Sequence, residues 1–110
     1  KKFIQDVREK GATPILVSLT PRNEWPGGKI ERRNDTYGKW YREVVAETGV
    51  EFVDVHNISA DYLDRKGQKK AKAYYNHDHT HTSFKGAQLN AKSVAKGLKD
   101  IHSSLAEYLK

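Results

Sequence analysis

The chain has 110 residues, with 20 Lys and Arg against 14 Asp and Glu, a net charge of +6 and a mean hydropathy of -0.85. It contains no cysteine, which excludes disulfides and thiolate metal sites. It also lacks an apolar stretch of the roughly 18 residues that a membrane helix needs. Residues 1–6 have no apolar segment of the kind found in signal peptides, so we expect neither a span nor a leader here.

The first elements predicted are a helix and a buried strand. Residues 1–10 carry apolar side chains on one helical face, and Gly11 can supply a left-handed stop. The run 15–19 is short and apolar, as in strands that are buried on both faces of a parallel sheet. Pro21 closes this strand because proline cannot donate a hydrogen bond to a neighbouring strand.

A loop and a second helix follow. The segment 22–33 has little periodicity and leaves the carboxyl end of the strand, where open α/β sheets bind ligands. Within it, Trp25 could stack on a sugar ring or merely cover the loop backbone. Asn34 or Asp35 can cap the next helix. We expect the core to receive an aromatic and aliphatic stripe on that helix, formed by Tyr37, Trp40, Tyr41, Val44 and Val45.

The apolar run 50–55 predicts a second buried strand. A strand, a helix and another strand make a right-handed crossover, which places the two strands side by side and parallel. His56 and Asn57 follow at the carboxyl end of the second strand. They are either walls of a pocket or ordinary polar loop residues.

Two further helical segments complete the chain. Ser59 is expected to cap the first, which runs on through the lysine-rich stretch 65–72 or frays at Gly67. The second is a long amphipathic helix in which Gly97 is the weak point. Its apolar positions recur at steps of four and three: Ala87, Ala91, Val94, Leu98, Ile101, Leu105 and Tyr108.

These elements predict part of a three-layer α/β/α sandwich with two parallel strands. Two strands make a poor free-standing core, because both edges of the sheet stay unpaired. We therefore expect the sheet to be covered by a further part of the domain or by a second copy of the chain.

The densest group of side chains that titrate near neutral pH lies in the segment 76–83, Asn-His-Asp-His-Thr-His-Thr-Ser. Asp78 and His81 are three positions apart, so one turn would let the carboxylate orient the imidazole as a general base. The alternation of His77, His79 and His81 would instead align three rings on an extended segment, as in a metal site. In a third interpretation the histidines are solvated and the segment only caps the next helix.

The block Asp78-His79-Thr80-His81-Thr82-Ser83, followed by Gly86-Ala87, resembles the last block of the SGNH (GDSL-type) hydrolases, in particular the rhamnogalacturonan acetylesterases. The runs 14–22 and 51–55 are similar to the fourth and fifth strands of that flavodoxin-like fold. The resemblance implies a serine esterase that removes acetyl groups from a rhamnogalacturonan- or pectin-like wall polysaccharide, without a metal or other cofactor. It also implies that Asp78 and His81 complete the catalytic triad.

The Gly-Asp-Ser nucleophile motif and the oxyanion blocks of that family are absent. None of the serines follows Gly-Asp; they are Ser18, Ser59, Ser83, Ser93, Ser103 and Ser104. Residues 1–110 therefore resemble the C-terminal portion of a single SGNH domain, which we expect to be inactive alone. Its expected partners are an acetylated polysaccharide and the missing N-terminal half or a second copy, but no membrane and no specific nucleic acid. Secretion or a periplasmic location is implied by the resemblance only.

Two alternatives from other classes remain open. A metal-binding module would use His77, Asp78, His79 and His81, and zinc would raise its melting temperature. A basic interaction module would use the run 65–72 and bind polyanions with a steep dependence on salt. The positive balance of the chain would also attract an acidic polysaccharide such as a pectin.

Overall fold

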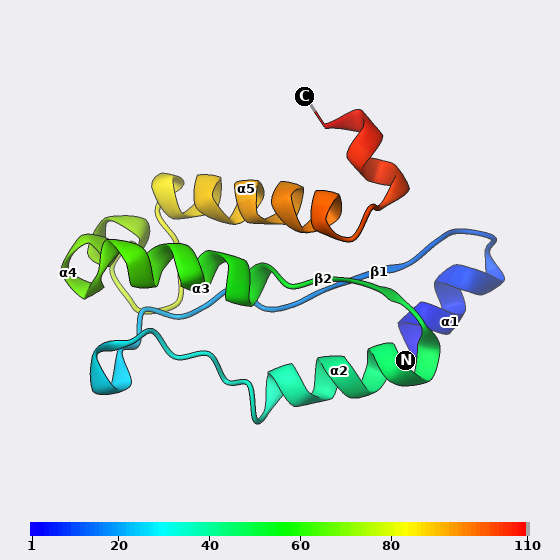
Figure 1. The fold of residues 1–110 in the computed structure, drawn as a ribbon, viewed down its shortest axis with the longest axis horizontal. Coiled ribbons are helices and arrows are strands. Elements are labelled where there is room, and N and C mark those ends of the chain that lie inside the picture. The colour runs from blue at the N-terminus through cyan, green and yellow to red at the C-terminus, as the bar shows by residue number, and fades with distance from the viewer. Residues whose placement is uncertain (110) are drawn as a thin grey trace.

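Helices lie on both sides of a two-stranded parallel sheet (Figure 1), in a computed structural model that describes residues 1–109. The elements are α1 (Lys2–Glu9), β1 (Ile15–Val17), α2 (Tyr37–Thr48), β2 (Glu51–Val53), α3 (Val55–Lys66), α4 (Gln68–Ala71) and α5 (Phe84–Asp100). Three short 3-10 turns are η1 (Pro26–Gly28), η2 (Lys72–Tyr74) and η3 (Ser104–Tyr108). The α/β class and the parallel pair are as predicted. Within the described residues no helix has the length and apolar character to cross a membrane.

The sheet separates two helical layers. β1 and β2 pair in the register Ile15 with Glu51, Leu16 with Phe52 and Val17 with Val53. Successive side chains of a strand point to opposite faces. Val53 accordingly packs under α5, where a Cβ on Gly97 would lie 2.5 Å from Val53 Cγ1. Phe52 faces α2 and stacks on Tyr41 with ring centroids 5.5 Å apart. Gly97, the predicted weak point of α5, is therefore the position that lets this helix approach the sheet.

Two apolar clusters form the core. One joins α3, α5 and the segment that precedes the histidine-rich loop, and it contains Ile30, Ala60, Leu63, Ala71, Tyr74, Tyr75 and Leu89. The other lies between β2 and the end of α5 and contains Val53, Val55 and Leu98. Both clusters include residues of α3 and α5. These two helices therefore position the histidine-rich loop, which lies between them in the sequence.

The third long helix begins earlier than the sequence predicts. Asp54 is its N-cap, and the carboxylate accepts a hydrogen bond of 3.2 Å from the Asn57 N–H. Ser59, the predicted cap, is fully buried inside the helix and hydrogen-bonds Asn90 and Ser93 of α5. The prediction was wrong because β2 ends at Val53, which leaves Asp54 free to cap. Gly67, with φ of 89°, ends this helix and separates it from α4.

The last helix is shorter than predicted. α5 ends at Asp100, and His102 adopts a left-handed φ of 55° that turns the chain. Leu105 and Tyr108 then lie in η3, where they are 48% and 79% exposed. Within α5 the predicted stripe is also only partly right, because Leu98 is buried but Ala87 and Ala91 are exposed, and the buried face passes through Gly86, Leu89, Ser93 and Gly97. The apolar spacing continues past the point where the backbone leaves the helix, so the pattern overstates its length.

The second helix begins at Tyr37, and its N-cap, Thr36, makes no capping hydrogen bond through its side chain, so neither Asn34 nor Asp35 is the cap. The prediction that its stripe enters the core was wrong, because no residue of this helix is buried. Tyr37 and Trp40 are 39% and 54% exposed, and Tyr41, Val44 and Val45 are half-buried. A sheet of two strands is too narrow to cover the whole stripe.

Candidate active site

The histidine-rich segment 76–83 is a loop held at its base by backbone hydrogen bonds. Tyr75 and Thr82 form an isolated antiparallel bridge, and the Ser83 N–H donates to the Tyr74 carbonyl at 3.1 Å. Inside the loop, the Asn76 N–H donates to the His81 carbonyl at 2.9 Å. The loop therefore closes as a short hairpin directly before α5.

Ser83 connects this hairpin to the helix. Its hydroxyl accepts a hydrogen bond of 3.2 Å from the Gly86 N–H, as an N-cap does, and donates to the Ala73 carbonyl at 2.7 Å. Gly86 then passes so close to Tyr74 that any larger residue would collide with the Tyr74 carbonyl oxygen. The start of α5 and the base of the loop are thus one packed unit.

Two long-range contacts fix the loop against the segment that follows β1. The Asn23 N–H donates to the His79 carbonyl at 2.8 Å. The Tyr75 hydroxyl donates to the Pro21 carbonyl at 2.6 Å, and burial raises the pKa of Tyr75 to about 12. The loop consequently lies beside the carboxyl end of the sheet, where parallel α/β folds place their ligands.

Asp78 and His81 contact each other within the loop. His81 Nδ1 lies 2.7 Å from one carboxylate oxygen of Asp78, and the other oxygen accepts the N–H groups of Thr80 and His81, both at 2.7 Å. Three contacts hold the pKa of Asp78 well below its usual range, because they favour the ionised carboxylate. In order of decreasing effect, they are the His81 N–H, the His81 ring and the Thr80 N–H. The carboxylate therefore stays ionised and acts as an acceptor only.

This contact determines what the imidazole can do. Because an ionised carboxylate can only accept, Nδ1 of His81 carries the proton that is shared with Asp78. In the neutral ring Nε2 then has a free lone pair, and no hydrogen bond to Nε2 occurs within residues 1–109. The side chain of His81 is 78% exposed. An imidazole in this arrangement can accept a proton at Nε2, with its orientation fixed by a carboxylate.

Five of the six serines in residues 1–109 form hydrogen bonds to other groups through their hydroxyls, including Ser103 as the cap of η3, and Ser104 is exposed. Ser18 is buried, and its hydroxyl accepts the His56 N–H at 2.9 Å. Ser83 caps α5, while Ser59 and Ser93 hydrogen-bond each other. No hydrogen bond between a serine and the His81 ring is found in residues 1–109.

The other histidines of the loop do not join His81 in a metal site. His79 Nδ1 lies 2.9 Å from the Thr80 hydroxyl, and His77 is exposed. In the described part of the chain no three His, Asp or Glu side chains converge as metal ligands would. The loop is bent and not extended, so alternate residues do not point the same way.

His56 and Asn57, predicted as pocket walls or polar loop residues, belong to a polar junction at the ends of the two strands and lie in α3. Sequence reasoning missed Asp54, the carboxylate of this junction. His56 is buried in the first turn of α3, and its Nδ1 donates to the Leu19 carbonyl at 2.9 Å, while Nε2 is buried without a partner in the described chain. Asp54 accepts from the Asn57 side chain at 2.7 Å. The sequence signal was a carboxylate directly after a buried strand. Trp25 is half-buried, and its N–H donates to Asn23 Oδ1 at 2.7 Å, which favours its role as a cover for the loop.

Three proteins of known name are similar to nearly all of this chain. It is 32% identical to the probable rhamnogalacturonan acetylesterase YesY of Bacillus subtilis, over 97% of this chain and 52% of that protein. It is 28% identical to the rhamnogalacturonan acetylesterase of Emericella nidulans, over 82% of this chain and 37% of that protein. It is 27% identical to rhamnogalacturonan acetylesterase RhgT of B. subtilis, over 97% of this chain and 53% of that protein. The chain thus spans about half the length of these relatives or less.

A solved structure has the same fold. The crystal structure of the protein YXIM of B. subtilis matches 94% of this chain and 30% of its own length, with a TM-score of 0.82 and 21% identity. No family model matches the chain.

Proposed function

Because the chain is a homologue of rhamnogalacturonan acetylesterases of the SGNH hydrolase family over nearly its whole length, we propose that it carries the general base of such an esterase. His81 is the base and Asp78 is the carboxylate that orients it. The enzyme removes acetyl groups from a wall polysaccharide of the rhamnogalacturonan or pectin type. The nucleophilic serine and the oxyanion donors come from a part of the domain outside this chain.

The observation that carries this proposal is the contact of 2.7 Å between His81 Nδ1 and Asp78 Oδ2 on an exposed loop. The N–H groups of Thr80 and His81 hold the other oxygen of Asp78 as in an Asx turn, so the carboxylate is fixed in place beside the ring. Here the backbone positions the carboxylate, the carboxylate positions the ring, and the ring exposes Nε2. This is the order of dependence that an acyl-transfer base requires.

The reaction follows from that order. The serine hydroxyl transfers its proton to Nε2 of His81 while its oxygen attacks the acetyl carbonyl. The imidazolium is stabilised by Asp78, and it returns the proton to the sugar oxygen as the carbon–oxygen bond breaks. Water then repeats the same steps on the acetyl-serine and releases acetate. Asp78 stays ionised throughout, which its low pKa permits.

A chimera tests the proposal. Residues 1–110 replace the aligned segment of YesY, and hydrolysis of a chromogenic acetyl ester is measured for the chimera, for YesY and for this chain alone. The chimera is expected to be active and the chain alone inactive. His81→Ala should abolish the activity of the chimera. His77→Ala is the matched control, because it removes an imidazole from the same loop but leaves the contact between Asp78 and His81 intact.

Circular dichroism of each chimera keeps folding separate from chemistry. A folded chimera that is inactive, while YesY is active, contradicts the proposed function. So does a His81→Ala chimera as active as its parent. Acetate release from acetylated rhamnogalacturonan, compared with acetylated xylan, then tests the substrate class.

A further inference from the structure

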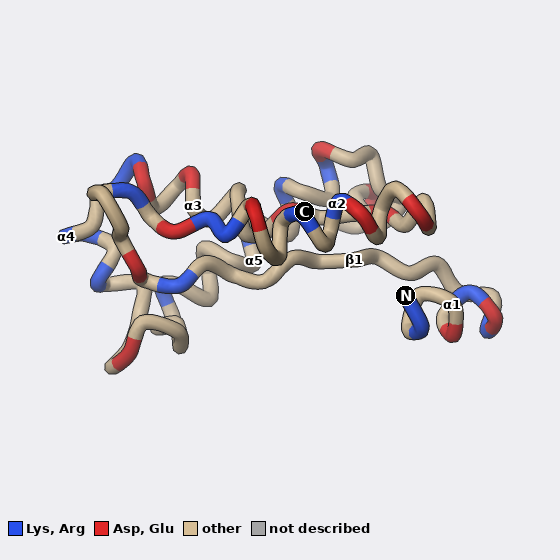
Figure 2. The backbone as a smooth tube through the Cα atoms, turned by 90° about the horizontal axis from the view of Figure 1, so that it is seen from below, with Lys and Arg blue, Asp and Glu red and all other residues tan. Residues whose placement is uncertain are grey.

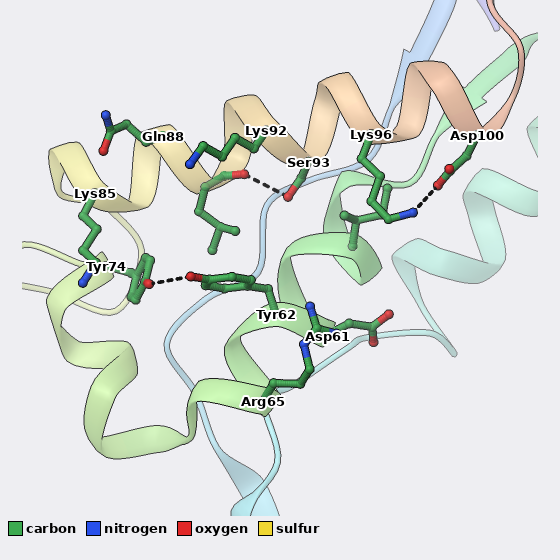
Figure 3. Close-up of a pocket in the computed structure, with 12 residues that line it drawn as sticks. Asp61, Tyr62, Arg65, Tyr74, Lys85, Gln88, Lys92, Ser93, Lys96 and Asp100 are labelled. Carbon is green, nitrogen blue, oxygen red and sulfur yellow. Dashed lines mark hydrogen bonds and ion pairs between the residues drawn. The ribbon is translucent and has the colours of Figure 1, made fainter.

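A groove of about 500 Å³ lies between α3 and α5, outside the loop that carries Asp78 and His81. Figure 3 shows that Tyr62 and Arg65 enter it from α3 and Lys85 and Lys92 from α5. The volume falls within the range of ligand pockets, about 300–1,000 Å³. The groove is large enough to hold part of a polymer or a small ligand.

The groove has an excess of free positive charge. Its two carboxylates already have cationic partners: Asp100 pairs with Lys96 at 2.7 Å, and Asp61 pairs at 2.6 Å with Arg32, which it shares with Asp64. The cations that remain make no ion pair within residues 1–109; they are Arg65, Lys85 and Lys92. These cations are therefore available to bind an anion that is not part of this chain.

Aromatic rings form the floor between these cations. The hydroxyls of Tyr62 and Tyr74 lie 3.1 Å apart, and the two rings meet edge to face. Lys85 Nζ lies 4.9 Å from the centre of the Tyr74 ring, and Arg65 Cζ lies 5.8 Å from that of Tyr62. Rings flanked by cations offer an apolar face and a charge at the same place, which suits a sugar ring with a carboxylate substituent.

The groove leads toward the candidate active site. The cationic positions of α5 run from Lys96 to Lys85, a distance of about 16 Å at the rise of a helix. At that end the main-chain carbonyl of Tyr74 accepts a hydrogen bond from the Ser83 N–H, at the base of the loop. A second group of lysines adjoins the same end, where α3 gives way to α4 (Figure 2). A polymer bound along the groove would therefore reach the loop with one of its ends.

We propose that this groove binds a carboxylate-bearing polysaccharide segment and holds it beside the loop. The choice of a uronic-acid polymer as the ligand rests on the proposed function, whereas the free cations and the aromatic floor do not depend on it. The carboxylates pair with Arg65, Lys85 and Lys92, and a sugar face lies on Tyr62.

Calorimetric titration of this chain with a de-esterified oligogalacturonate tests the inference. Lys85→Gln/Lys92→Gln should weaken binding roughly tenfold, as expected for the loss of two exposed ion pairs, and should reduce the dependence on salt. Lys10→Gln/Lys39→Gln is the matched control, since it removes the same charge from α2 and the end of α1. That control should bind nearly as the wild type does.

Three results would overturn the inference: absence of binding, equal weakening in the control pair, or tighter binding of a single-stranded oligonucleotide of equal charge. An uncharged galactan should not bind. The His81→Ala chain should bind as the wild type does, because binding does not use the base. Binding without hydrolysis by the chimera would contradict the proposed function alone, and hydrolysis without binding would contradict the groove alone.

Discussion

A Cβ placed on Gly86 would lie 2.0 Å from the carbonyl oxygen of Tyr74. The helix α5 can start where it does only because this position has no side chain, and the same contact holds the base of the candidate active-site loop. Both elements must move if the residue is enlarged.

We expect Gly86→Ala to destabilise the protein by about 2 kcal/mol, in the range of other changes that overfill a packed site. Helix propensity alone predicts the opposite, a gain of about 1 kcal/mol. Urea denaturation decides between the two. Ala87→Gly at the next, exposed position is the control, and it should cost about 1 kcal/mol through propensity. A Gly86→Ala variant as stable as the wild type would mean that the loop base is looser than described.

Asp78→Asn should reduce the activity of the chimera by about 10⁴-fold, because an amide can present its N–H to Nδ1 and favour the wrong tautomer of His81. The ring would then have no free lone pair on Nε2. The ratio of kcat for the two chimeras measures this. Retention of most of the activity would show that His81 does not depend on Asp78 for its orientation.

The low pKa of Asp78 makes a prediction about acid. A carboxyl whose pKa is lower in the folded chain contributes stability above its unfolded value, about 3.9, and this contribution is lost as the pH falls further. The Asp78 side-chain carbonyl signal in NMR should therefore stay that of a carboxylate down to about pH 3, below the usual midpoint. A titration midpoint near 4 would contradict the hydrogen bonds described for this carboxylate.

Tyr75 makes the corresponding prediction in alkali. Its pKa is raised by burial to about 12, so it stabilises the fold fully below the unfolded value, about 10, and loses this effect as the pH rises through about 12. Tyr75→Phe should cost about 1 kcal/mol through loss of the bond to Pro21. The difference in tyrosinate absorbance between the two proteins isolates this residue. A midpoint near 10 would show that the hydroxyl is exposed.

Arg32 ties the loop after β1 to α3. It pairs with Asp61 and with Asp64; burial would raise the pKa of Asp64, but the Ile30 N–H and the Arg32 guanidinium hold it below its usual range. Arg32→Gln should cost about 2 kcal/mol. Arg33→Gln breaks only the more exposed pair with Glu24 and should cost about 0.5 kcal/mol. Thermal unfolding of both variants is the measurement, and equal losses would contradict this assignment.

Local spacing was sufficient to predict the parts of the fold and site that local contacts form. The contact between Asp78 and His81 spans three residues, so a single bend creates it. The parallel pair followed from two apolar runs separated by a helix. The strands pair residues 36 positions apart, but their order and direction follow from the handedness of the single crossover between them.

The features that were missed depend on distant residues or on a single backbone angle. The hydrogen bond from Tyr75 to Pro21 joins positions 54 residues apart, and neither residue type indicates that the other is its partner. The end of α5 depends on the left-handed backbone of His102, which the uninterrupted apolar spacing hides. Asp54 was missed as a cap because the apolar run was extended to Val55, one residue beyond it.

The hydrogen bonds that attach the loop to its surroundings come mostly from main-chain atoms, such as the Asn23 N–H and the carbonyls of Tyr74 and His79. Main-chain groups are the same in every residue except proline. Substitutions at His77 or at His79 can therefore accumulate without moving the loop. Evolution, or a protein engineer, can therefore vary these two side chains to change selectivity, while the main-chain hydrogen bonds that hold the loop stay the same.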